Sequence, residues 1–351
     1  DNRGTATWTA GSVGGTGGVY NNLAGAFFDV QANIGTFGGT AITFNNAGTL
    51  QRTAGTSTAT IGATLDNSGL IDIQSGRLTF SGGVSNSGDV QLGVGSSLRI
   101  QGGDMVLDTG TTWSGDGTLE FVSGTLQVNT DVTLGGLSVT PLSSNTTAVL
   151  SGAGNVTVDG KFSWSGGTLE GSGKLITRGS DSLISGSNTK VLQRGIDNFG
   201  TIAWTDGAIQ AADGVVFSNQ EGATFDARSS DSFTNSLATF NNAGTLLKSA
   251  GNNVSRFSPL LNNSATGTVQ VQIGILELRG GGSSSGRFQI DAGTLRVNGG
   301  SYVLNDGWNA SGPGNFQISG GTVQAAGSGS IAGGLSLGSS SAAILSGAGD
   351  V

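Results

Sequence analysis

Paired carboxylates are the residues of this chain whose types and spacing come closest to catalytic chemistry. Two close Asp or Glu side chains can hydrolyse a glycosidic bond, one as the acid and the other as the base or nucleophile. The candidate pairs are Asp104/Asp108, Asp116/Glu120 and Asp206/Asp213. They are scattered along the chain, so we interpret them as solvated charges at turns and on strand faces. The sequence therefore assigns no catalytic residue and predicts that the chain is not an enzyme.

Glycine-rich turns beside Asp or Lys raise the question of metal and phosphate sites. The chain has no Cys and no His, which excludes thiolate and imidazole ligands. Calcium-binding solenoids repeat GGxGxDxUx, and the Gly pairs of this chain lack Asp at that spacing. Gly160-Lys161 and Gly173-Lys174 precede strand-like residues, whereas a phosphate loop precedes a helix. We therefore predict no metal and no cofactor.

Five tryptophans are the candidate binding residues. Trp8 and Trp204 occupy matching positions of the internal repeat described below, and an exposed indole can stack on a sugar ring. The competing interpretation is that these rings fill the apolar core, as large aromatic residues usually do. A carbohydrate-binding adhesin, with surface polysaccharide as its partner, therefore stays open as a second function. A polysaccharide-degrading enzyme is the third.

Charge and hydropathy exclude two classes of partner. The net charge is −8, and binding to nucleic acid requires clustered Lys and Arg. No apolar run approaches the roughly 20 residues that span a bilayer. We therefore expect no nucleic acid and no membrane insertion. The Asn-x-Ser/Thr sequons are expected by chance in a chain of this composition, and they begin at Asn145, Asn155, Asn253, Asn262 and Asn309.

An internal repeat organises the chain. FNNAGTLQRTAG at residues 44–55 recurs as FNNAGTLLKSAG at residues 240–251, an offset of 196. LSGAG at residues 150–154 recurs at residues 345–349. We therefore predict a repeat module at residues 1–196 and a second, truncated copy at 197–351, continuous with the first and belonging to a longer array.

A shorter period runs inside each module. Asn followed by Gly recurs about every 20 residues, as at Asn46/Gly48, Asn67/Gly69 and Asn86/Gly88. Each marker precedes short alternating segments such as Ile71 and Ile73, which indicate half-buried strands. No segment has the apolar spacing and the caps of a helix.

These features predict an all-β fold, a right-handed parallel β-solenoid with coils of about 20 residues and no helices. About 17 coils spaced by about 4.8 Å would extend for about 80 Å. We expect Gly and Asn at the corners because those positions often require φ > 0. We also expect stacked Asn amides to bond from coil to coil. The alternative is an array of β-sandwich domains, which would need longer strands.

The phrases NNAGTL, DNSGLIDIQSGRLTF and SNSGDVQL, in a cysteine-free chain, resemble the repeats of bacterial secreted β-helix proteins. These are the filamentous haemagglutinin-like and autotransporter passenger adhesins. The resemblance implies an extracellular or cell-surface location and a structural role as a rigid rod, stalk or filament for adhesion or matrix. The expected partner is the continuation of the same chain or another copy bound end to end. The resemblance supplies no catalytic residues.

Overall fold

A computed structural model describes residues 1–33, 35–143, 147–338 and 343–349. These residues form strands and turns without any helix. The strands make a parallel β-solenoid, with about 16 coils of roughly 21 residues in all, which confirms the predicted fold class. The chain divides into two compact units, Asp1–Leu175 and Ile176–Val351. The predicted modules 1–196 and 197–351 are defined by sequence homology and stay a prediction.

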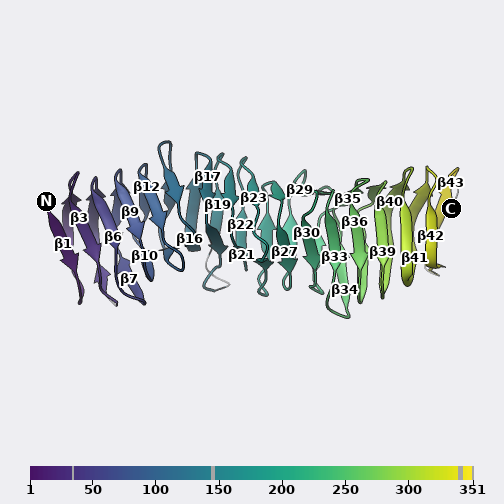
Figure 1. The fold of residues 1–351 in the computed structure, drawn as a ribbon, viewed down its shortest axis with the longest axis horizontal. Coiled ribbons are helices and arrows are strands. Elements are labelled where there is room, and N and C mark those ends of the chain that lie inside the picture. Colours follow the sequence, from purple (N-terminus) through teal and green to yellow (C-terminus); the bar gives the residue numbers. More distant parts are fainter. Residues whose placement is uncertain (34, 144–146, 339–342, 350–351) are drawn as a thin grey trace. The chain divides into compact units, whose positions relative to one another are not determined.

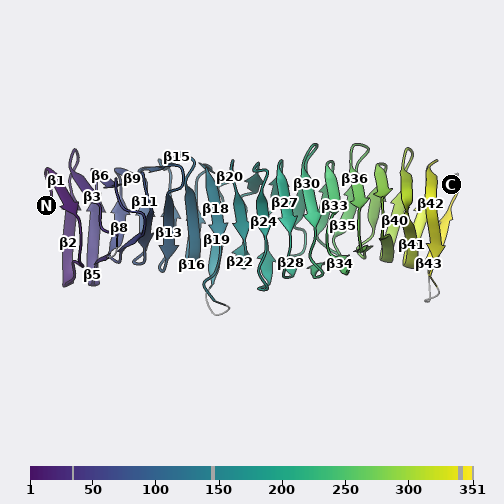
Figure 2. The same cartoon turned by 60° about the horizontal axis from the view of Figure 1, so that its bottom comes forward.

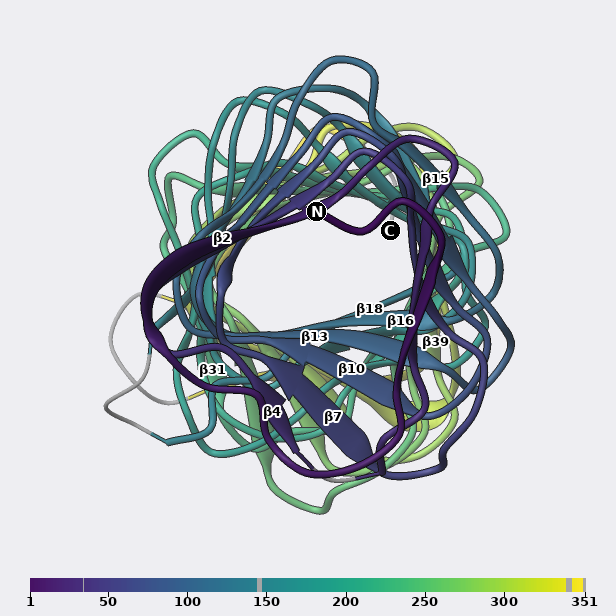
Figure 3. The ribbon, with the colours of Figure 1, turned by 90° about the vertical axis from the view of Figure 1, so that its left-hand side faces the viewer.

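Unit 1 stacks its strands in three columns, and Figures 1 and 2 show successive strands of a column side by side. Column 1 contains β2 (Thr16–Asn22), β5 (Thr40–Asn46), β8 (Thr64–Asn67), β11 (Val84–Asn86), β14 (Met105–Leu107), the second half of β16 (Thr118–Val128), β19 (Ala148–Ser151) and β22 (Gly167–Leu169). Column 2 contains β1 (Thr5–Trp8), β3 (Phe27–Val30), β6 (Thr49–Arg52), β9 (Leu70–Ile73), β12 (Asp89–Leu92) and β15 (Thr112–Ser114), while β17 (Val132–Leu134) pairs with β20 (Val156–Val158). Column 3 contains β4 (Thr36–Phe37), β7 (Thr58–Ile61), β10 (Arg77–Phe80), β13 (Ser97–Gln101), the first half of β16, β18 (Gly136–Val139) and β21 (Phe162–Trp164). Viewed end-on in Figure 3, β4, β7, β10 and β13 follow one another on one face of this unit.

Unit 2 also contains three columns of parallel strands, and β23 (Leu175–Thr177) contains the division between the units. The columns of unit 2 are numbered by the sequence repeat, so each takes the number of the column in unit 1 that holds the matching residues, and the number does not mean that the two columns are paired. Column 1 contains β26 (Ile196–Asn198), β29 (Val216–Asn219), β32 (Thr239–Asn242), β35 (Leu260–Asn263), β38 (Gly282–Ser284), part of β40 (Thr294–Leu304), part of β41 (Asn309–Ala325) and β43 (Ala343–Gly347). Column 2 contains β24 (Ser182–Ile184), β27 (Thr201–Trp204), β30 (Thr224–Ala227), β33 (Thr245–Lys248), β36 (Thr268–Val271), β39 (Arg287–Ile290) and parts of β41 and β42 (Ser330–Leu337). Column 3 contains β25 (Lys190–Leu192), β28 (Ile209–Ala211), β31 (Ser232–Thr234), β34 (Val254–Phe257), β37 (Ile275–Leu278) and the remaining parts of β40, β41 and β42.

The core is built from every second residue of most strands, as the alternating pattern predicts. In β9, Ile71 and Ile73 are fully buried, whereas Leu70 and Asp72 are partly exposed. In column 1 of unit 1, Phe44 lies in register with Leu65 of the next coil. Full burial of such a side chain stabilises the fold by about 1.5–3 kcal/mol. All the strand pairings named above are parallel, so the β-sandwich alternative is wrong.

A series of asparagines, all buried except the half-buried Asn2, connects the coils at the end of column 1. In unit 1, the side-chain amides of Asn2, Asn22, Asn46 and Asn67 each donate to the asparagine oxygen of the next coil, at 2.5–2.8 Å. In unit 2, Asn198, Asn219 and Asn242 do the same at 2.8–2.9 Å. We call each series an asparagine ladder. Their presence confirms that corresponding markers such as Asn46 and Asn67 lie in adjacent coils and bond to each other.

The reason given above for Asn and Gly at these corners is wrong for the ladder. Among the described non-glycine residues, only Ala41 and Asn235 have positive φ. The hydrogen bonds of the side-chain amides, and not an unusual backbone conformation, therefore explain the asparagines of the ladder. Gly69 also lacks a positive φ, but a Cβ there would lie 2.1 Å from the carbonyl oxygen of Gly48. The backbones of neighbouring coils approach too closely at this corner for any side chain.

Candidate functional site

Three carboxylates of the first and third candidate pairs bind neighbouring coils. Asp104 Oδ1 accepts a hydrogen bond of 2.8 Å from the Thr125 amide, and Asp108 Oδ1 accepts one of 2.7 Å from Asn129 Nδ2. Asp213 Oδ1 accepts one of 2.7 Å from Asn235 Nδ2. These hydrogen bonds connect successive turns, so these side chains have a structural role.

Glu120 is an ion-pair partner, which its spacing from the exposed Asp116 does not reveal. Its carboxylate lies 2.9 Å from Arg77 Nη2 and 2.8 Å from Arg99 Nε, on the outer face of column 3. Burial raises the pKa of Glu120, but the hydrogen bonds from Arg77, Ser97 and Arg99 outweigh it and leave that pKa below its usual value. Glu120 is therefore held as an anion and is a poor general acid.

Asp206 meets a carboxylate that the sequence did not pair with it. Asp206 Oδ1 and Asp231 Oδ2 both accept hydrogen bonds from the Gly207 amide, at 3.0 and 2.8 Å. Beneath this turn the buried Lys190 ammonium donates to the carbonyl oxygens of Gly186 and Asp206. Burial lowers the pKa of Lys190 to about 8, against the opposing effect of the two carboxylates. The cluster is a turn that holds two carboxylates and one buried ammonium.

Two further buried cations were not predicted from the sequence. Arg52 is fully buried and donates to the carbonyl oxygens of Ala32, Ser57 and Ser75, at 2.8–3.1 Å. Its repeat counterpart Lys248 is also fully buried. Burial lowers the pKa of both side chains, while nearby aspartates act in the opposite direction. The sequence does contain a feature that could have revealed them, because each cation stands at an inward-facing position of an alternating strand.

The Arg52 and Lys248 side chains close the turn that follows their own strands. Lys248 Nζ donates to the Ala250 carbonyl oxygen at 3.0 Å and to Ser255 Oγ at 2.9 Å. A buried cation that satisfies several orphan carbonyl groups stabilises a corner that water cannot reach. We therefore assign both residues to the fold rather than to a reaction.

The tryptophans are structural where the repeat aligns them. Trp8 is 5% exposed and Trp204 is fully buried. Trp8 Nε1 donates to the Gly11 carbonyl oxygen at 3.1 Å, and Trp204 Nε1 donates to that of Gly207 at 2.7 Å. The matching positions thus carry the same turn-closing bond. Neither ring offers a face to a sugar, so the hypothesis of carbohydrate binding through these aromatics is wrong.

The remaining candidate motifs also lie on strands and turns. Lys161 precedes β21 and Lys174 precedes β23, so no helix follows either Gly-Lys turn. Across the described ranges, no three His, Cys, Asp or Glu side chains are grouped to hold a metal ion. Of the sequons, Asn155 binds Asp131 through its side chain, and Asn145 lies outside the described residues.

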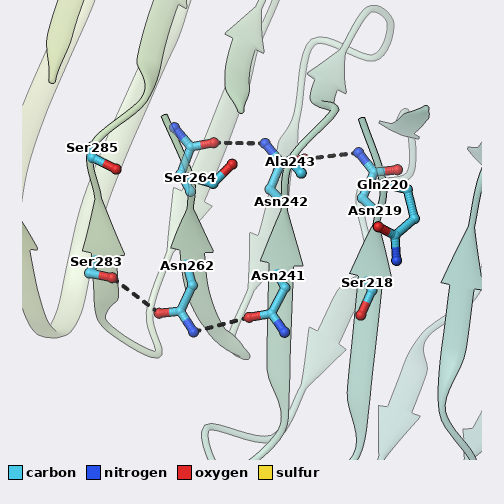
Figure 4. A pocket seen from close by; sticks show the side chains of 11 residues that line it. Ser218, Asn219, Gln220, Asn241, Asn242, Ala243, Asn262, Ser264, Ser283 and Ser285 are labelled. Carbon is cyan, nitrogen blue, oxygen red and sulfur yellow. Dashed lines mark hydrogen bonds between the residues drawn. The ribbon is translucent and has the colours of Figure 1, made fainter. Parts of the chain in front are cut away.

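A polar groove in unit 2 is the strongest candidate site, and it crosses the ends of β29, β32, β35 and β38 (Figure 4). It encloses about 340 Å³. Its floor is the asparagine ladder, and its two rims are rows of exposed or half-buried side chains. The floor contains Asn219, Asn242 and Asn263; one rim contains Ser218, Asn241, Asn262 and Ser283; the other contains Gln220, Ala243, Ser264 and Ser285. None of these side chains is ionisable.

The first rim forms a second row of hydrogen bonds on the surface. Asn262 Nδ2 donates to Asn241 Oδ1 at 3.1 Å, and Ser283 Oγ donates to Asn262 Oδ1 at 3.3 Å. Strand pairing sets Ser218, Asn241, Asn262 and Ser283 in register across four coils. The groove can therefore offer fixed, uncharged donors and acceptors, but it holds no acid, base or nucleophile activated for catalysis.

Two further findings concern the chain as a whole. Among the residues that the structure describes, there is no helix with the length and apolar character needed to cross a bilayer. No family model, no curated protein and no solved structure matches the chain.

Proposed function

We propose that this chain is a structural repeat segment of a large bacterial protein that is secreted or displayed on the cell surface. In this role its coils provide length and stiffness for a rod, stalk or filament that serves adhesion or an extracellular matrix. The proposal assigns the chain no enzymatic activity.

The coil-to-coil bonding inside each unit is the observation that supports a structural role. Each coil pairs with the next through three columns of parallel strands, and the asparagine ladder adds buried side-chain bonds along the same direction. Stacks of this kind resist bending because every layer is fixed to its neighbours in register. The proposed location rests on the resemblance of the repeat phrases to secreted bacterial adhesins.

The partner that we propose is another layer of coils, either from the same chain or from a second copy bound end to end. Leu337 of β42 lies in register on Ile318 of β41. Ile318 is fully buried, whereas Leu337 is 58% exposed. A further coil on this strand would bury Leu337. It would also pair with the backbone N–H and C=O groups along the edge of β42, since an uncovered strand edge leaves such groups unpaired.

Small-angle X-ray scattering of the purified chain tests the rod. If the roughly 16 coils form one continuous stack, a spacing of about 4.8 Å between coils predicts a length on the order of 80 Å. A compact particle of about half that length would refute the proposal. Antibodies against the chain should label intact cells of the source bacterium, and labelling that appears only after permeabilisation would refute the location.

A further inference from the structure

The groove of Figure 4 has a chemical character that the proposed structural role does not use. We propose that it is a binding site for a linear, neutral polysaccharide that lies along the groove, across β29, β32, β35 and β38. The proposal concerns the groove alone and does not depend on where the protein is located or how long the assembled rod is.

Unused hydrogen-bonding groups are the first argument. Each amide has two donors and an acceptor, and each hydroxyl can both donate and accept. The Asn241 oxygen is engaged by Asn262, but its NH₂ group makes no bond within the protein. The Ser218 hydroxyl and the side-chain amide of Gln220 likewise have no protein partner, and both residues line the groove. A sugar chain, whose hydroxyl groups also donate and accept, is complementary to such a set.

The spacing of the groups is the second argument. The rim side chains recur once per coil, about every 4.8 Å, so four coils present them over about 14 Å. Their strands are fixed by parallel pairing and by the buried ladder beneath them. A rigid periodic row recognises a ligand that is itself periodic, and little conformational entropy is lost by the protein on binding.

Other classes of ligand fit the groove less well. Without a cation among its lining residues it has nothing to pair with an anionic polymer, and without a carboxylate it has nothing to pair with a cationic one. Its only aliphatic side chain is Ala243, so it lacks the apolar anchors of protein interfaces. The strands beneath it are already paired on both sides, which prevents a peptide from adding to the sheet.

Unit 1 provides an internal comparison. The corresponding row there is Asn21, Asn45, Asp66 and Ser85, also in register. Asp66 is exposed and stands where unit 2 has Asn262. Its carboxylate removes an amide donor and adds a charge that a neutral ligand would have to desolvate. We therefore assign polysaccharide binding to the groove of unit 2.

Saturation-transfer NMR of the full chain with cellohexaose, mannohexaose and maltohexaose tests the proposal. At least one of these neutral hexasaccharides should bind with a dissociation constant on the order of 1 mM, weak because the groove has no aromatic ring. Asn262→Asp, which installs the side chain of unit 1, should weaken binding at least about tenfold. Asn241→Leu should do the same, since it removes the free NH₂ group.

The control is Asn45→Asp, which makes an equivalent change in unit 1 and should leave binding unchanged. Circular dichroism of each variant checks that the fold is intact. The proposal is overturned if none of the three sugars binds at about 10 mM, or if Asn262→Asp and Asn241→Leu leave the affinity unchanged. Tighter binding of the anionic hexagalacturonate would also overturn it. So would self-association of the chain that Asn241→Leu abolishes, because the groove would then be a contact between copies.

Discussion

Substitution of Asn242 by Asp tests whether the asparagine ladder stabilises the solenoid. Asn242 is 1% exposed and accepts from Asn219 Nδ2 at 2.8 Å. It donates to Asn263 Oδ1 at 2.8 Å and to the Thr268 carbonyl oxygen at 3.0 Å. Asp has nearly the same shape and keeps the acceptor, but it cannot make the two donated bonds when ionised. Its second oxygen would instead face two acceptors.

The expected loss follows from these contacts. Each buried acceptor that loses its donor costs about 1–3 kcal/mol, so the two together predict a decrease of about 2–6 kcal/mol in the free energy of unfolding at pH 7. Burial of an unpaired carboxylate adds to this and raises its pKa above the unfolded value of about 3.9. At pH values between the unfolded pKa and the higher folded pKa of the introduced carboxyl group, the folded variant binds a proton that the unfolded variant has released. The deficit relative to wild type should therefore shrink as the pH falls toward 4.

Denaturant unfolding followed by tryptophan fluorescence, to which Trp204 and Trp308 of the same unit contribute, measures this difference. The control is Asn241→Asp, one residue earlier, where the side chain is exposed and accepts only the bond from Asn262. This surface change should alter the free energy of unfolding by no more than about 0.5 kcal/mol. Equal stabilities for Asn242→Asp and Asn241→Asp would refute the reasoning, as would a deficit that does not respond to pH.

Three other substitutions have outcomes that follow from the structure. The Tyr302 hydroxyl is fully buried without a hydrogen-bond partner, so Tyr302→Phe should raise the free energy of unfolding by about 1–3 kcal/mol, measured by denaturant unfolding; a loss of stability would contradict this. The Lys190 pKa of about 8 lies below its unfolded value, so the unfolded chain holds more protons above pH 8. Stability should therefore rise by up to about 3 kcal/mol from pH 8 to about 10.5, and Lys190→Met should lose that rise in the same assay at several pH values. Gly69→Ala would place Cβ 2.1 Å from the Gly48 carbonyl oxygen and should cost more than about 2 kcal/mol, seen as a lower thermal midpoint; an unchanged midpoint would show that the corner can relax.

The contacts between coils explain why the fold was predictable. Asn46 bonds to Asn67, and Phe44 packs in register with Leu65, so residues about 21 positions apart are neighbours. In a solenoid this separation recurs in every coil, and the residue type suited to a corner or column therefore recurs in the sequence. The asparagine ladder was predictable for the same reason.

The candidate site was less predictable, because its features depend on which side chains meet between coils. Asp206 was paired with Asp213 by sequence distance, but it shares the Gly207 amide with Asp231, one coil away. The groove itself combines Asn241, which faces outward, with Asn242, which faces inward. Sequence reasoning recognised the repeated Asn pair, but not that its two members serve a surface row and a buried row.

The sequence by itself determined the parallel stacking, the coil length, the near absence of reactive residues and the identity of the ladder. Each of these is a periodic or compositional property, which a one-dimensional pattern records directly. Only the tertiary structure decided that Trp8 and Trp204 are buried, that Arg52 and Lys248 lie inside the coils and that a neutral groove opens over unit 2. Burial and the meeting of side chains depend on the lateral register of adjacent coils and on the path of each turn, and alternation along one strand does not specify either.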